Sequence, residues 1–492
     1  MTPFPLGVRS LFAGLPDEPS HEATRPPNWA ATFTPSIHQG ALDPARAIVI
    51  GDRGTGKSFW ASVLADDGMR RRVSVRYPGL GLDRVVSALG FSSNPTTLRH
   101  PTASVIARIG TDTERLESLW RAVVLRLSPH PPAALAGEAI DWTQAAAWVA
   151  DDPALRAAEL LALDARLLES GQVYVLVFDA LDLLGERWSD IRARMRGLIR
   201  LALAVRPLRA VRVKLFLRPD MAEDQTMWAV GDASKLRHNE VELLWRRRDL
   251  YGLLWTLLGN PERPEAGAQF RDYCRTLIGT AFKNEDGTWR PPLGLVADEA
   301  EQEKVFHALA GEWMGRDRRR GNTFTWVTNH LADAAGYAAP RSFLLAMRGA
   351  AQSARSTEFV LDRSGIEDGV RRASKVRVDE LSEDYRWMGT VLEALKGLTV
   401  PIEKMQLISR WQERDTLATL RTLAEHEAQD HRFIPPEGVL DARNDELAYR
   451  SLTDVMVRLR IFLELADDRI NIPDLFRLRA DIKRRGGMKP RG

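Results

Sequence analysis

The chain has 492 residues, of which 69 are basic and 66 acidic, so its formal net charge is only +3 at neutral pH. A single cysteine, Cys274, excludes an internal disulfide framework and a cluster of thiolate metal ligands. No apolar run reaches about 18 residues, and the first residues lack a signal-peptide pattern, which favours a cytoplasmic protein without a membrane span. At about 100–200 residues per domain, the length predicts about three domains.

Residues 1–45 contain eight prolines and predict an irregular lead-in that packs against the domain after it. Residues 46–50 predict a buried strand, and residues 57–67 a helix that starts at Lys57. The stretch RRVSVRY, residues 71–77, predicts a second strand. Apolar residues at steps of three and four then predict helices over residues 113–127 and 143–169.

Three further apolar runs predict buried strands: QVYVLVFD at 172–179, AVRVKLFLRPD at 210–220 and NEVELLW at 239–245. A helix over residues 186–205 separates the first two runs. Strands that alternate with helices are typical of a doubly wound α/β domain with a parallel sheet, which here ends near residue 245.

Residues 51–58, GDRGTGKS, match the phosphate-binding loop G-x-x-x-x-G-K-[ST] at every fixed position, between a predicted strand and a predicted helix. Glycines let backbone amides turn toward phosphate oxygens, and the helix N-terminus adds its dipole. Lys57 would reach the β- and γ-phosphates, and Ser58 would ligate Mg²⁺. The expected nucleotide-binding residues are Gly51, Asp52, Arg53, Gly54, Thr55, Gly56, Lys57 and Ser58.

The loop needs a carboxylate on a neighbouring strand, and Asp179 ends one of the apolar runs, where it can hold the water shell of Mg²⁺. Asp182 lies three residues on and either positions an attacking water or caps the following helix. Arg218 follows another buried strand, from which it either senses the γ-phosphate or joins a salt bridge.

The stretches VFDALD and FLRPD resemble the STAND branch of the AAA+-related P-loop ATPases, in particular its NACHT-type members, over residues 40–260. The resemblance implies that Asp179 is the Mg²⁺ aspartate, Asp182 the second acid and Arg218 the sensor. These relatives often have a further acid where this chain has Leu183, which implies slow hydrolysis. No Asn-Lys-x-Asp guanine signature is present, which favours ATP over GTP.

Two later stretches, VELLWRRRDLYGLL and HLADAAGYAAPRSFLLAMRGAA, resemble the helical lid of the same class. The resemblance makes Arg341, at the start of a predicted helix, a candidate for the lid arginine that touches the γ-phosphate. Between them, basic and aromatic residues either hold a nucleic-acid backbone and stack on bases or form a charged loop before a core helix. These residues are Arg316, Arg318, Arg319, Arg320, Phe324 and Trp326.

The chain ends in a predicted helix at 452–463, a strand, a turn, a strand and a helix, and a helix followed by a hairpin is the ending of a winged helix. Arg458, Arg460 and Arg469, with the basic stretch that follows, fit phosphate contacts. In STAND proteins, however, a winged helix often packs on the ATPase and holds it closed, so both interpretations stay open.

The sequence thus predicts an α/β P-loop NTPase core with a parallel sheet at 46–245, a helical lid at 246–383, and a winged-helix domain with a basic tail at 384–492. The expected cofactors are ATP and Mg²⁺, and the expected function is a slow ATPase switch suited to bacterial defence or regulation. A partner protein would supply the output, and the chain would act in a homo-oligomer or a larger complex. The alternatives are a DNA-binding AAA+-like loader or motor that acts on duplex DNA, and a module that holds nucleotide without hydrolysing it.

Overall fold

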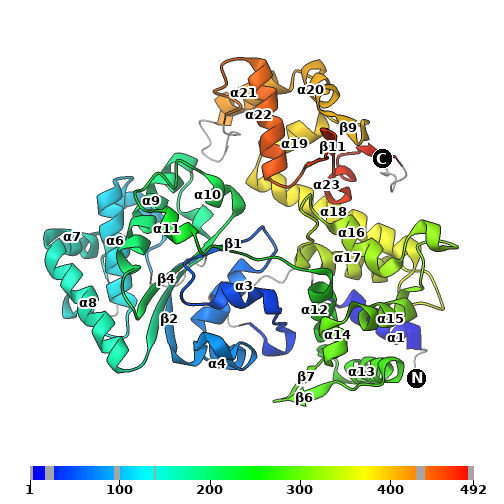
Figure 1. Cartoon of the computed structure of the whole chain (residues 1–492), viewed down its shortest axis with the longest axis horizontal. Helices are drawn as coiled ribbons and strands as arrows, with labels where there is room; N and C mark the ends of the chain where they lie inside the picture. The colour runs from blue at the N-terminus through cyan, green and yellow to red at the C-terminus, as the bar shows by residue number, and fades with distance from the viewer. Residues whose placement is uncertain (1–3, 17–26, 94–99, 138–139, 428–437, 486–492) are drawn as a thin grey trace. The chain divides into compact units, whose positions relative to one another are not determined.

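The computed structural model describes residues 4–16, 27–93, 100–137, 140–427 and 438–485 (Figure 1). The chain forms two compact units, which we name by their content. Residues 34–244 carry the sheet unit, and residues 4–16, 29–33 and 245–485 form the helical unit. Within the described ranges, no helix is long and apolar enough to cross a bilayer.

The sheet unit is built on five parallel strands in the order β2-β3-β4-β1-β5, which confirms the predicted α/β class. Ile50 of β1 lies opposite Leu217 of β4, and Leu215 of β4 lies opposite Phe178 of β3, so these three strands end close together. Their apolar runs are buried because helices cover both faces of the sheet. The strands are β1 (Ile48–Ile50), β2 (Val85–Phe91), β3 (Val173–Phe178), β4 (Val211–Leu217) and β5 (Val241–Glu242).

Helices connect these strands. They are α2 (Gln39–Leu42), α3 (Lys57–Ala65), α4 (Asp67–Arg76), α5 (Ala103–Ile109), α6 (Thr113–Leu127), α7 (Trp142–Asp151), α8 (Pro153–Glu169), α9 (Trp188–Val205), α10 (Pro219–Glu223) and α11 (Ser234–Arg237). The predicted helices at 57–67, 113–127 and 186–205 are confirmed, and the one at 143–169 is interrupted before Pro153.

The strand predicted at residues 71–77 is wrong, because this stretch belongs to α4. Asp66 caps the helix by accepting a hydrogen bond from the Met69 backbone N–H at 2.7 Å. Val73 is buried and Val75 is 75% exposed, whereas in a strand the two would share a face. The second strand is β2, where a Cβ at Gly90 would come within 2.6 Å of the Phe178 ring, so close packing there requires glycine.

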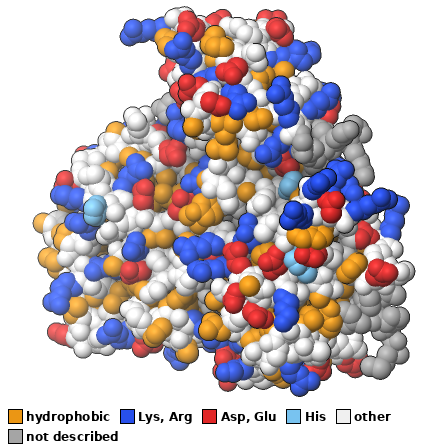
Figure 2. All heavy atoms as spheres, turned by 45° about the vertical axis from the view of Figure 1, so that its right-hand side comes forward, with side chains coloured by type: hydrophobic (Ala, Val, Ile, Leu, Met, Phe, Trp, Pro, Cys, Tyr) orange, Lys and Arg blue, Asp and Glu red, His pale blue; other side chains and the backbone are white. Residues whose placement is uncertain are grey.

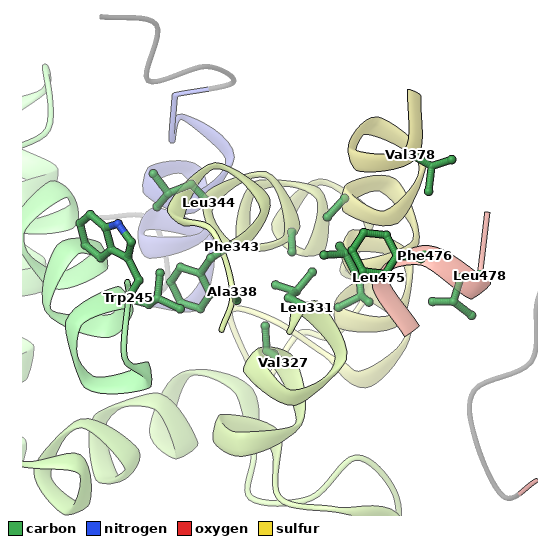
Figure 3. Close-up of a cluster of buried hydrophobic side chains, with 14 of the residues drawn as sticks. Trp245, Val327, Leu331, Ala338, Phe343, Leu344, Val378, Leu475, Phe476 and Leu478 are labelled. Carbon is green, nitrogen blue, oxygen red and sulfur yellow. The ribbon is translucent and has the colours of Figure 1, made fainter. Parts of the chain in front are cut away.

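The helical unit begins with α12 (Arg247–Gly259) and α13 (Pro264–Ile278), which carries the buried Cys274. A hairpin of β6 (Lys283–Glu285) and β7 (Thr288–Arg290) follows, and then α14 (Leu293–Ala297), α15 (Glu299–Ala310), α16 (Thr323–Leu331), α17 (Pro340–Ser353) and α18 (Arg363–Asp384). Figure 3 shows part of its core, where Leu331 and Phe343 from α16 and α17 lie in the same cluster as Phe476 near the end of the chain. Burial raises the pKa of the Cys274 thiol well above its usual value.

The lead-in contains a helix that the proline count did not predict, α1 (Phe4–Ala13). Pro5 is tolerated because its missing N–H falls in the first helical turn, where no intrahelical partner exists. Phe12 is fully buried among the side chains of the helical unit. The Arg9 guanidinium donates hydrogen bonds to the carbonyls of Val360 at 2.9 Å and Phe359 at 2.6 Å, and so ties α1 to the segment before α18.

The last part of the helical unit contains α19 (Trp387–Glu393), α20 (Lys404–Glu413), α21 (Thr416–Glu427), α22 (Asp445–Arg458) and α23 (Asp474–Arg477). The strands β9 (Ile402–Glu403), β10 (Leu463–Glu464) and β11 (Arg469–Asn471) form an antiparallel sheet in the order β10-β11-β9, and β8 (Thr399–Val400) pairs with β12 (Lys483–Arg484). The predicted order of helix, strand, strand and helix is confirmed, although the helix expected at 452–463 runs from Asp445 to Arg458.

A buried histidine fixes the position of α3 within the sheet unit. The Trp60 indole N–H donates to His38 Nδ1 at 3.0 Å, so the ring proton lies on Nε2 and is donated to the Leu244 carbonyl at 2.8 Å. Burial lowers the pKa of His38 to about 4. The neutral ring therefore joins the lead-in, the helix after the glycine loop and the end of β5.

We expect the stability of the protein to fall below neutral pH because of His38. Its ordinary pKa of 6.5 is depressed to about 4 in the folded state, so its contribution is complete above pH 6.5 and is lost as the pH falls toward 4. Between pH 7.5 and 5.0 this amounts to about 2 kcal/mol. Urea unfolding of wild type and His38→Gln at both pH values measures it. A stability gap between the two proteins that does not shrink at pH 5.0 would contradict this assignment.

Candidate nucleotide site

The glycine loop follows β1 and ends where α3 begins. Gly54 and Gly56 have left-handed backbones, with φ of 81° and 105°, a conformation that favours glycine. A Cβ at Gly51 would lie 2.5 Å from the Thr55 hydroxyl oxygen, and that hydroxyl donates to the Asp52 carbonyl at 2.8 Å. Residues 51–58 thus form a tight turn, and a hydrogen bond within the loop, from Thr55 to Asp52, stabilises it.

Lys57, at the first position of α3, folds back over this loop. Its ammonium group donates to the carbonyl oxygens of Gly51 at 2.7 Å and Asp52 at 3.0 Å. Burial lowers the pKa of Lys57, while the carboxylates of Asp179, Asp182 and Asp52 act in the opposite direction. The positive charge of Lys57 is therefore stabilised by hydrogen bonds to two neutral carbonyls and by the nearby carboxylates.

Asp179 follows β3, and its backbone N–H donates to the Phe91 carbonyl at 3.1 Å. Its side chain is buried, and neither carboxylate oxygen accepts a hydrogen bond of full geometry, although the Ser58 hydroxyl and the Ala180 backbone N–H lie close to it. Burial raises the pKa of Asp179, although the Ser58 hydroxyl and the Lys57 ammonium lie near enough to favour its charged form. A buried carboxylate with incomplete hydrogen bonding is costly, and a bound cation would offset that cost.

The donor set at this point fits Mg²⁺. The Ser58 hydroxyl and the Asp179 carboxylate are hard oxygen ligands of the kind that Mg²⁺ prefers, and Mg²⁺ usually keeps several waters and phosphate oxygens in its shell. In the described ranges no group of three His, Cys, Asp or Glu side chains could hold a metal by itself. A metal here would therefore depend on the phosphates of a bound nucleotide.

Asp182 and Arg218 form an ion pair at the same end of the sheet. Arg218 follows β4, and its Nη1 lies 3.5 Å from Asp182 Oδ2. The guanidinium also contacts Asp220 through two hydrogen bonds, from Nε to Oδ1 at 3.1 Å and from Nη2 to Oδ2 at 2.9 Å. Asp182 lies within a short 3₁₀ turn, η6 (Leu181–Leu183). The residue that caps the following helix, α9, is Arg187, so the alternative that Asp182 caps that helix is wrong.

The structure thus brings Lys57, Ser58, Asp179, Asp182 and Arg218 together at the carboxyl ends of β1, β3 and β4. The sequence pattern predicted no role for Asp220, although it stands only two residues after Arg218. Arg341 lies in the helical unit, where its Nη1 pairs with Glu380 Oε1 of α18 at 2.7 Å. Its expected role toward the γ-phosphate stays a prediction.

A glycine loop between a parallel strand and a helix, with Lys and Ser at the helix start and a buried acid after a neighbouring strand, defines a P-loop NTPase core. Neither a model of any protein family nor a curated protein matches the chain. Among solved structures, the Aeropyrum pernix ORC1 protein in complex with DNA is 15% identical with a TM-score of 0.32, covering 92% of this chain and 93% of that one. The Aeropyrum pernix ORC2 protein (ADPNP-ADP complexes) is 12% identical with a TM-score of 0.29, covering 88% and 85%. Likenesses this low carry no conclusion about activity.

Replacing Asp179 should stabilise the nucleotide-free protein. Because burial outweighs the groups that favour its charge, Asp179→Asn should raise the free energy of unfolding by about 1 kcal/mol at pH 7. Urea unfolding without nucleotide or Mg²⁺ measures the change.

Asp164→Asn is the matched control. This buried carboxylate accepts hydrogen bonds from the backbone N–H groups of Arg209 at 3.0 Å, Ala210 at 2.6 Å and Val211 at 3.1 Å. Its replacement should cost about 1–3 kcal/mol. A loss of stability in Asp179→Asn as large as that of the control would mean that the protein itself satisfies the Asp179 charge.

Proposed function

We propose that the protein is a Mg²⁺-dependent, ATP-binding and slowly hydrolysing switch related to the AAA+ ATPases. Residues 46–245 would be the ATPase core, residues 246–383 the lid and residues 384–492 a winged-helix domain. One observation carries the proposal: a buried carboxylate with incomplete hydrogen bonding, Asp179, lies beside the lysine and the serine of a complete phosphate-binding loop.

Lys57 and the loop would bind the triphosphate. The two carbonyls that now accept from Lys57 Nζ are neutral, so phosphate oxygens can replace them with a stronger, charge-assisted bond. Ser58 Oγ and the Asp179 carboxylate would hold Mg²⁺, directly or through water. When bound, the metal neutralises charge on the phosphates. The N-terminus of α3 adds its dipole to the same site.

Asp182 and Arg218 would link hydrolysis to movement. In the structure the two side chains form an ion pair with each other, and Asp220 forms a second ion pair with the same guanidinium. Contact of Arg218 with a γ-phosphate would weaken its pair with Asp182 and leave that carboxylate to orient water. Leu183 is 47% exposed next to this pair, at the position where STAND relatives often have an acid, and this supports slow turnover.

The charges of the turn between β10 and β11 support a switch over a loader that would bind DNA through this hairpin. The sheet β10-β11-β9 with α20 and α22 fits a winged helix. However, the hairpin turn carries Asp467 and Asp468, and Arg469 already pairs with Asp467 at 2.7 Å. Like-charge repulsion would oppose approach of this hairpin to DNA phosphates. We therefore propose that this module contacts protein.

The finer form of the proposal is a STAND-type cytoplasmic switch in bacterial defence or regulation. A partner protein would supply the output, and lid closure through Arg341 would control assembly into a homo-oligomer or complex. For Arg341 to act in this way, it would have to leave its ion pair with Glu380. The nucleotide state would then be transmitted as the exchange of one buried charge partner for another.

Purified protein should bind ATP with Mg²⁺ and hydrolyse it at a rate well below about 1 s⁻¹, the low end of ordinary turnover numbers. Lys57→Ala should weaken ATP binding at least about 100-fold, since it removes a charge-assisted hydrogen bond to phosphate. Arg218→Ala should bind ATP but hydrolyse it at least about 10-fold more slowly. Calorimetry and phosphate release measure these effects. Lys235→Ala removes an exposed lysine, paired with Asp232, from the same unit and should change neither.

Two results would redirect this proposal. Hydrolysis that depends on Lys57 but rises many-fold with duplex DNA would favour the loader or motor. Absence of ATP binding by the wild-type protein would overturn the assignment of the loop.

A further inference from the structure

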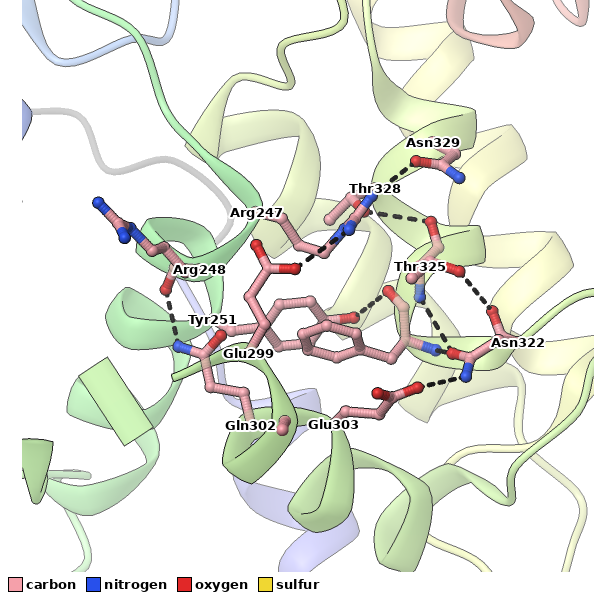
Figure 4. Close-up of polar contacts among 12 residues, drawn as sticks. Arg247, Arg248, Tyr251, Glu299, Gln302, Glu303, Asn322, Thr325, Thr328 and Asn329 are labelled. Atoms are coloured by element: carbon pink, nitrogen blue, oxygen red, sulfur yellow. Dashed lines mark hydrogen bonds and ion pairs between the residues drawn. The ribbon is translucent and has the colours of Figure 1, made fainter. Parts of the chain in front are cut away.

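The turn between α15 and α16 has a rigid base. Trp313 and Asn322 form an antiparallel bridge, and the Met314 N–H donates to the Gly321 carbonyl at 2.8 Å. The Asn322 side chain caps α16 by accepting from the N–H groups of Phe324 at 3.0 Å and Thr325 at 3.3 Å, and its amide donates to Glu303 of α15 (Figure 4). The residues between Trp313 and Asn322 are therefore presented on a fixed frame.

Four arginines project from this frame. Arg316, Arg318, Arg319 and Arg320 are all exposed, and their guanidinium groups have no ion pair or hydrogen bond within the described ranges. The one acid among them, Asp317, accepts a hydrogen bond from the Arg319 backbone N–H at 2.9 Å. Residues 315–320 thus carry four positive charges and one negative, a net charge of +3. We call this segment the arginine turn.

Three other exposed arginines each pair with an acid one turn away on the same helix. Arg71 pairs with Asp67 at 2.7 Å, Arg275 with Asp272 at 3.3 Å and Arg363 with Glu367 at 3.1 Å. In the arginine turn, like charges lie side by side without such partners, an arrangement that self-repulsion disfavours unless an anion is bound. The turn therefore fits a partner of high negative charge density.

The surroundings disfavour two kinds of partner. Phe324 is buried and stacks on Tyr251 with ring centroids 4.2 Å apart, so the expectation that it stacks on bases is wrong. Trp326 stacks on His330 with centroids 3.7 Å apart. Recognition of single strands relies on free aromatic faces. No large apolar side chain is exposed between residues 311 and 331, so the apolar anchor of a protein interface is absent as well.

We propose that the arginine turn binds the phosphate backbone of double-stranded DNA. Guanidinium groups match phosphate oxygens with paired hydrogen bonds, and a duplex offers closely spaced charges without any need for stacking. Such contacts position a protein on DNA and read no sequence. Figure 2 shows Lys and Arg side chains gathered on the side that comes forward from the right of Figure 1, where the turn between α15 and α16 lies. The inference goes beyond the ATP switch and does not depend on it.

The test compares two triple variants of equal charge. One is Arg318→Gln, Arg319→Gln and Arg320→Gln in the arginine turn. The other is Arg71→Gln, Arg275→Gln and Arg363→Gln, which removes three exposed arginines that are paired elsewhere. Fluorescence anisotropy with a labelled 30-base-pair DNA duplex measures affinity for the full chain from about 50 to 200 mM salt, where phosphate binding depends steeply on salt.

The wild-type protein should bind the duplex, and the turn variant should bind at least about 10-fold more weakly. Its salt slope should be smaller by up to about 2.7, which is about 0.9 for each phosphate that the variant no longer neutralises. The control variant should stay within about two-fold of wild type. Equal weakening in both variants, or no binding by wild type, would overturn the inference. So would tighter binding to an RNA duplex or to polyglutamate than to DNA. ATP affinity, measured in parallel, keeps a failure here distinct from a failure of the nucleotide site.

Discussion

The sheet unit is organised around two opposite charges that the protein buries and leaves incompletely satisfied. The Lys57 ammonium donates to two carbonyls of its own loop, and no donor within the described residues meets full hydrogen-bond geometry at the Asp179 carboxylate. Burial disfavours the charged form of each, and each favours the charge of the other. The strands around both groups are lined by buried apolar side chains. A site that is unfavourable when empty gains most from a ligand that carries both phosphate and metal.

The strand order places a second charged group beside the first. Because β4 lies between β1 and β3, Arg218 at the end of β4 is adjacent to both the loop and the acids after β3. Its pairs with Asp182 and Asp220 hold it in the absence of any anion. Ion pairs that exchange partners are a common basis of two-state behaviour. In the helical unit, Arg341 and Glu380 form a pair of the same kind.

The core of this site could be predicted from local sequence patterns. The other features depend on contacts between residues far apart in the chain, which local patterns do not show. The loop, α3 and the strand before Asp179 follow from residues that are adjacent in the chain. Ser87 and Gly90 interrupt the apolar run of β2, so its pattern does not predict a strand. Val73 and Val75 alternate with polar residues, so the sequence of α4 resembles a strand. The helix α1 depends on contacts of Arg9 with carbonyls about 350 residues away. No residue spacing predicts the hydrogen bond between Arg218 and Asp220. Nor does any spacing predict that Phe324 stacks on Tyr251 and is therefore not available for stacking beside the arginine turn.

The lone thiol of the chain has a practical consequence. Cys274 is enclosed within the helical unit, and burial keeps it protonated, so it is a poor nucleophile toward alkylating dyes. A cysteine introduced at an exposed position would therefore react selectively against an inert background, without prior removal of the native one. Pairs of such positions, one in each unit, could carry donor and acceptor fluorophores. Energy transfer between them would measure whether added nucleotide changes the distance between the two labelled positions.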